Sequence, residues 1–176
     1  MQRGPLNPLS VRDNQSRFAF KACSRSPPSI YPIADHMHTP DLHRIRASFA
    51  WFSPCGPALI AQAVRLAADR DDDIRSLLPE NQEHLNTLLF RTLGHIVKHA
   101  DNFALLEAQM ATVASRAAKA GVRPKQLPLM RDSLLAALGA LAGEQWTPAL
   151  ARDWETLLDA IMGTMLAAPS VTRQAA

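Results

Sequence analysis

Several side chains that can ligate metals occur in this 176-residue chain, and their spacing limits the chemistry open to them. His95 and His99 are four residues apart, so on a helix both imidazoles face one side and can share a metal ion when a third ligand is near. No third ligand is evident, which favours a solvated pair. Met110 and Met130 offer thioether sulfurs, but methionine at helical spacing usually fills a core.

The remaining reactive groups do not form a catalytic pattern. Asp69 and residues 71–73 make an acidic run that lacks the glycine and the terminal glutamate of a calcium loop, as is typical of a solvated corner. Cys23 and Cys55 have no CxxC spacing, which indicates reduced thiols and a cytoplasmic protein. Because no Ser-His-Asp set or phosphate-binding glycine loop is evident, we do not expect an enzyme.

The positive charge of the chain is concentrated near its N-terminus. Residues 1–39 hold five basic and two acidic side chains, and the rest of the chain holds fourteen of each. Residues 1–38 also contain five prolines and no helical period, so we expect a disordered extension that binds neither nucleic acid nor membrane. A natural start at Met37 is one hypothesis for this segment. We expect a second tail over residues 169–176.

Between these tails, residues 39–168 show apolar positions three and four apart, which predicts an all-α domain of about six main helices. Local signals mark their ends. Thr39 is the expected cap of the first helix, Gly121 and Gly143 are expected stops, and Thr147 is the expected cap of the last helix. One predicted helix carries the apolar residues Leu88 and Leu93, and the next has Phe103 and Leu106 on one side. In the helix after that, Leu138 and Leu141 are expected to face inward.

The order of these features resembles the globin domain of bacterial haemoglobins and flavohaemoglobins. The agreement covers roughly residues 40–167 and includes the tryptophan of the last helix, Trp154. The strings that carry it are residues 47–50 with Pro54, 74–79, 93–97, 121–124 and 146–148.

The resemblance implies a haem pocket, but the residues expected to serve it are replaced. Ala117 stands where the proximal histidine belongs, and no histidine follows Asp101. Leu127 replaces the tyrosine that supports that histidine, and Leu78 replaces the aromatic residue that packs on the ring. Ala63 and Val64 occupy the region of the oxygen-binding tyrosine. The pocket positions implied by the resemblance are Leu78, Leu85, Leu89, Ala117, Leu127 and Met130.

These replacements predict a globin-like protein that is haem-free or binds haem weakly, with a regulatory or interaction role or a small apolar ligand. The alternative is a protein that binds haem b, and through it oxygen or nitric oxide, with His84 as the iron ligand. A dioxygenase role would require a separate reductase partner. We also expect that two chains can pair through the last two helices.

Overall fold

The computed structural model describes residues 39–168, which form seven α-helices and three short 3-10 segments. The all-α prediction of about six main helices is confirmed, with α3 as a short additional helix. The predicted extension over residues 1–38 and the predicted tail over 169–176 lie outside the described residues. The helices are α1 (Leu42–Phe52), α2 (Gly56–Ala68), α3 (Asp72–Leu77), α4 (Glu83–Lys98), α5 (Phe103–Lys119), α6 (Leu127–Ala142) and α7 (Pro148–Ala167). The 3-10 segments are η1 (Ser53–Cys55), η2 (Pro124–Gln126) and η3 (Gly143–Gln145).

Side chains with short polar groups begin four of these helices by accepting a backbone N–H that has no partner within the helix. The predicted Thr147 cap is confirmed. The prediction of Thr39 is wrong, because the carboxylate of Asp41 takes this role and α1 begins at Leu42. In each case a backbone N–H donates to the side chain of the cap: Arg44 to Asp41 (3.0 Å), Ile74 to Asp71 (3.0 Å), Leu105 to Asn102 (3.1 Å) and Leu150 to Thr147 (3.2 Å).

Both glycines expected to stop helices have left-handed backbone conformations. Gly121 follows α5 with φ +95°, and Gly143 ends α6 with φ +55°. Glycine adopts these angles without the steric cost that a Cβ brings. Both predicted stops are therefore confirmed.

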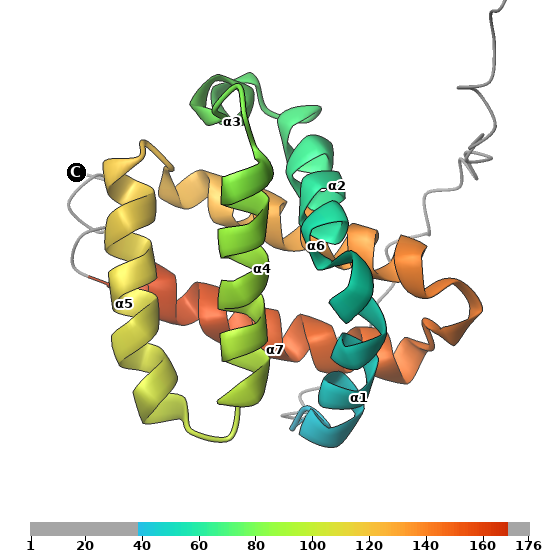
Figure 1. Ribbon diagram of the computed structural model, residues 1–176. Helices are drawn as coiled ribbons and strands as arrows, with labels where there is room; N and C mark the ends of the chain where they lie inside the picture. The colour runs from blue at the N-terminus through green and yellow to red at the C-terminus, as the bar shows by residue number, and fades with distance from the viewer. Residues whose placement is uncertain (1–38, 169–176) are drawn as a thin grey trace, which may run out of the picture. The chain divides into compact units, whose positions relative to one another are not determined.

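The helices pack in two crossing groups, and Figure 1 shows α6 and α7 running behind α4 and α5. α2 packs on α6 and α4, α5 packs on α7, and α1 contacts both α4 and α7. The main core takes side chains from all six long helices, with Trp154 of α7 and Leu138 of α6 fully buried. No helix in the described part of the chain is long and apolar enough to cross a membrane.

Two glycines let α1, α2 and α4 approach closely. A Cβ on Gly56 of α2 would lie only 2.2 Å from the ring of Phe90 on α4, and a Cβ on Gly94 of α4 would lie 3.2 Å from the ring of Phe49 on α1. The two rings stack with centroids 5.1 Å apart. Because Gly56 and Gly94 have no side chain, the stacked rings of Phe49 and Phe90 fit between these helices.

Three apolar residues of the predicted helices are exposed: Leu88 (44%), Phe103 (52%) and Leu141 (47%). Phe103 is the first residue of α5 and Leu141 lies one residue before the end of α6, where the neighbouring helices offer less cover. At 100° per residue, Leu88 lies about 140° around α4 from the buried Leu93. The prediction that Leu141 faces inward is therefore wrong, whereas Leu138 is buried as expected, and Leu93 and Leu106 are buried too.

Candidate functional site

The end of α5 and the start of α6 bring Ala117 and Leu127 together. After Gly121 reverses the chain, the N–H of Val122 donates to the carbonyl of Ala117 at 3.0 Å, and η2 leads directly into α6. Ala117 is half-buried and Leu127 is buried. Both line a cavity of about 10 Å³, together with Ala114, Ala118, Val122, Arg123, Pro124 and Met165.

This small cavity does not fit an iron-ligating site. Ligation of haem iron by a protein needs a side chain with a donor atom, usually an imidazole nitrogen, and alanine has none. A volume of about 10 Å³ is close to the room taken by one water molecule, far below the several hundred Å³ of ordinary ligand pockets. Of the residues that line it, Met165 is buried and offers a thioether, which is a weak donor that more often serves as core filler.

The other predicted pocket residues do not line this cavity. Leu78 and Met130 pack against a second, small core cluster formed by Ala67, Ala68 and Ile74. Leu89 packs on the main core, and Leu85 is half-buried on α4. The structure thus places Ala117 and Leu127 at one cavity, and Leu78 and Met130 at the small cluster, with Met130 also packing on the main core.

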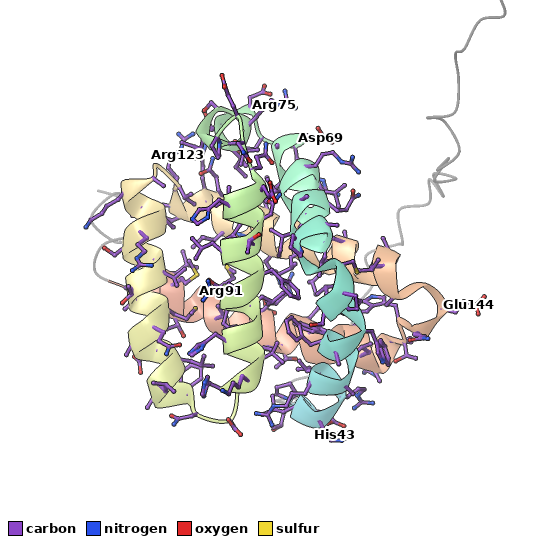
Figure 2. All side chains as sticks on the ribbon, in the orientation of Figure 1. His43, Asp69, Arg75, Arg91, Arg123 and Glu144 are labelled. Carbon is purple, nitrogen blue, oxygen red and sulfur yellow. The ribbon has the colours of Figure 1, made fainter. Side chains whose placement is uncertain are left out.

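None of the histidines in the described part of the chain belongs to α5. His43 is on α1 (Figure 2) and His84 and His95 are on α4, all three with exposed side chains. His99 follows α4, half-buried, with its ring centroid 4.4 Å from that of His95. Within residues 39–168 no three histidine, cysteine or acidic side chains come close enough to hold a metal ion.

The acidic corner, instead of forming a cation site, joins α3 to the start of α6. Figure 2 shows Asp69, Arg75 and Arg123 at the same end of the domain. Arg123 forms an ion pair and hydrogen bond with Asp73, and the amide of the buried Gln126 donates to Asp71 at 3.2 Å. We call Asp71, Asp73, Arg123 and Gln126 the corner clasp.

The corner clasp lies next to the cavity that Ala117 lines. Arg123 belongs both to the clasp and to the cavity lining. Close by, a Cβ on Gly121 would lie 2.9 Å from the Cδ2 atom of Leu77, so α3 and the turn after α5 are in tight contact. Sequence reasoning missed the clasp, since its partners are about fifty residues apart and only the tertiary fold brings them together.

Comparison with known proteins agrees with this architecture. The family model described as globin matches residues 67–165, which is more than half of the chain. This chain belongs to the globin family. The match begins near the end of α2 and includes the whole of α3 to α6 and nearly all of α7, so it spans both Ala117 and Leu127 in this globin.

A solved structure shows the same fold in a distant relative. The globin is similar to an engineered carbene transferase built on a protein named as a nitric oxide dioxygenase of Rhodothermus marinus. The two share 24% sequence identity at a TM-score of 0.65, and the similarity covers 78% of this chain and 96% of the other. No curated protein matches the sequence. At this identity the similarity shows the fold alone.

Proposed function

We propose that this globin is a haem-independent, non-enzymatic domain that binds a small apolar molecule. The observation that carries the haem-independent part of the proposal is that Ala117 and Leu127 line one cavity of about 10 Å³, at the position where the family resemblance implies the proximal histidine. An alanine methyl group supplies no lone pair to iron, and a histidine side chain would not fit in the volume beside it.

The arrangement of polar groups around this position supports the same proposal. The corner clasp holds α3 against the start of α6, and Arg123 is engaged with Asp73 beside the cavity lining. Separating α3 from η2 would break that exposed ion pair and the part-buried bond from Gln126 to Asp71. The exposed ion pair is worth at most about 1 kcal/mol, and leaving the buried Gln126 amide without its partner costs about 1–3 kcal/mol.

The alternative is haem b held through His84. This histidine is exposed and stands on α4, one residue before the half-buried Leu85. For His84 to reach iron inside the domain, α4 would have to rotate and expose other side chains that are now packed. The alternative therefore becomes an outcome of the test rather than a second proposal.

Haemin titration of the purified chain distinguishes the haem-independent proposal from the alternative with His84 as the iron ligand. We expect no saturable uptake of one haemin per chain, and the same weak, unspecific spectrum for the wild type and for His84→Ala. Saturable uptake that disappears in His84→Ala would establish the alternative. Saturable uptake that is unchanged in His84→Ala would mean that another side chain ligates the iron, and this would also contradict the proposal. Circular dichroism of both proteins controls for folding.

A further inference from the structure

A second and much larger cavity lies at the other end of α5 from the Ala117 turn. Its volume is about 200 Å³, and it opens to the surface between the start of α1, the first half of α5 and the middle of α7. The lining residues come from all three helices and from the two short links that precede α1 and α5. Those that carry the argument are Phe103, Leu106, Met110, Thr156, Ala160 and Thr164.

The walls of this cavity are almost wholly apolar. Leu106 and Met110 of α5 are buried, as are Leu157 and Ile161 of α7. The lining contains no charged side chain. A bound molecule therefore gains from removing apolar surface from water and finds no side chain that could neutralise a charge.

The two threonines in the lining do not change this chemistry. Thr156 donates its hydroxyl to the carbonyl of Arg152 at 2.8 Å, and Thr164 donates to the carbonyl of Ala160 at 2.9 Å. Both hydrogens are thus used within α7. A ligand that needs a hydrogen-bond donor finds no free hydroxyl hydrogen there, while a methyl group or an aromatic ring loses nothing.

The size of the hollow favours a small molecule over a folded protein partner. It has a volume of about 200 Å³ and is lined by side chains of three helices and two short links. Pockets for small molecules are hollows of this kind with mostly apolar walls.

We propose that this cavity between α5 and α7 binds a small hydrocarbon group, about the size of a benzene ring or slightly larger. An apolar cavity of about 150 Å³ in another protein stays dry and takes benzene, so about 200 Å³ accommodates a ring with a short substituent. The inference rests on the proposed function, since it names the place and the ligand class for a globin that works without haem.

The test is a benzene titration of the full chain followed by NMR of the methyl groups. We expect saturable shifts at Leu106, Ile161 and Thr164, with a dissociation constant of about 1 mM. Ala160→Phe places a ring in the opening and should weaken binding at least about tenfold. Because Ala160 is exposed, this variant should fold. Ala136→Phe on α6, also an exposed alanine in mid-helix, is the matched control and should bind as the wild type does.

Three results would overturn the inference: no saturable shift in the wild type, shifts centred on other methyl groups, or unchanged binding by Ala160→Phe. Pyridine has the shape of benzene but its nitrogen needs a donor, so we expect clearly weaker binding. Equal affinity would contradict a hydrocarbon site. Loss of benzene binding leaves the haem question untouched, and haem uptake at another site leaves the benzene result standing, so the two proposals fail separately.

Discussion

Ala117 of α5 and Leu127 of α6 line one cavity of about 10 Å³ across the Gly121 turn. In the resemblance to bacterial globins, these two positions belong to the iron ligand and to the tyrosine that supports it. Both are apolar in this chain. Apolar side chains at these two positions leave no polar group there of the kind that an iron ligand and its hydrogen-bond partner would supply.

Leu127 should contribute strongly to stability because it is only 4% exposed. Leu127→Ala removes buried apolar atoms and enlarges the neighbouring cavity, and we expect it to lower the free energy of unfolding by about 2–5 kcal/mol. Leu88→Ala is the matched control, because Leu88 is 44% exposed and its loss should change the free energy by less than about 0.5 kcal/mol. Urea denaturation measures both, and equal effects would contradict the burial of Leu127.

The contact between α1 and α7 depends on Ser48. Its hydroxyl oxygen accepts the indole N–H of Trp154 at 3.0 Å, and both residues are fully buried. Ser48→Ala leaves that N–H without this acceptor, so we expect a loss of about 1–3 kcal/mol. Ser76→Ala, at an exposed serine, should have little effect. Thermal unfolding of the two variants checks the prediction, and a harmless Ser48→Ala would mean that the indole finds another partner.

A buried carboxylate anchors the start of α1. Asp153 is fully buried on α7 and accepts from Arg44 Nε at 2.6 Å and from the backbone N–H of Asp41 at 3.1 Å. Asp153→Asn keeps the shape but removes the charge, and hydrogen bonds to charged groups are worth about 1.5–3 kcal/mol. We expect a destabilisation in that range in chemical denaturation. Asp72→Asn, at a highly exposed carboxylate, is the control, and similar stability of the two variants would contradict the prediction.

Arg46 of α1 joins the end of α4 to the following turn. It donates to the carbonyls of Val97 and Lys98 at 3.3 and 3.1 Å and pairs with Asp101 at 3.0 Å. The hydrogen bond from Arg46, followed by a backbone hydrogen bond, lowers the pKa of the Asp101 carboxyl below its ordinary value. A carboxyl whose pKa is lower in the folded state stabilises the fold above its unfolded-state pKa, and this stabilisation is lost as the pH falls through the folded-state pKa.

We therefore expect the Asp101 contribution to disappear only in strongly acidic solution, below about pH 4. In Arg46→Ala the pKa of Asp101 should rise toward its ordinary value, which an NMR titration of the carboxyl carbon measures directly. Arg91→Ala removes an exposed arginine from α4 and should leave that pKa unchanged. An unchanged Asp101 titration in Arg46→Ala would show that the backbone, not the guanidinium, holds the pKa down.

Local signals in the sequence predicted most of the fold because they act through neighbouring residues. Gly121, Gly143 and Thr147 end or begin helices through backbone angles and a hydrogen bond within four residues. The error at Thr39 has the same origin, since Asp41 is an equally good cap two residues later and the sequence does not decide between them.

The contacts that shape the site could not be predicted in this way. The corner clasp joins Asp73 to Arg123, and Asp153 accepts a hydrogen bond from Arg44, which lies more than a hundred residues earlier in the sequence. Such pairs depend on how whole helices cross, which short-range patterns do not specify. The cavity between α5 and α7 was missed for the same reason, because the apolar side that Phe103 shares with Leu106 does not show how closely α7 covers it. Pairing of two chains through the last two helices stays a prediction.

The most direct test of the account is the haem content of the full chain purified from cells supplied with abundant haem. Absorption spectroscopy and a pyridine haemochrome assay together give the amount of haem per chain. We predict no strong Soret band and far less than one haem per chain, because Ala117 offers no ligand and the cavity beside it is about 10 Å³. A strong Soret band with one haem per chain would contradict the central claim.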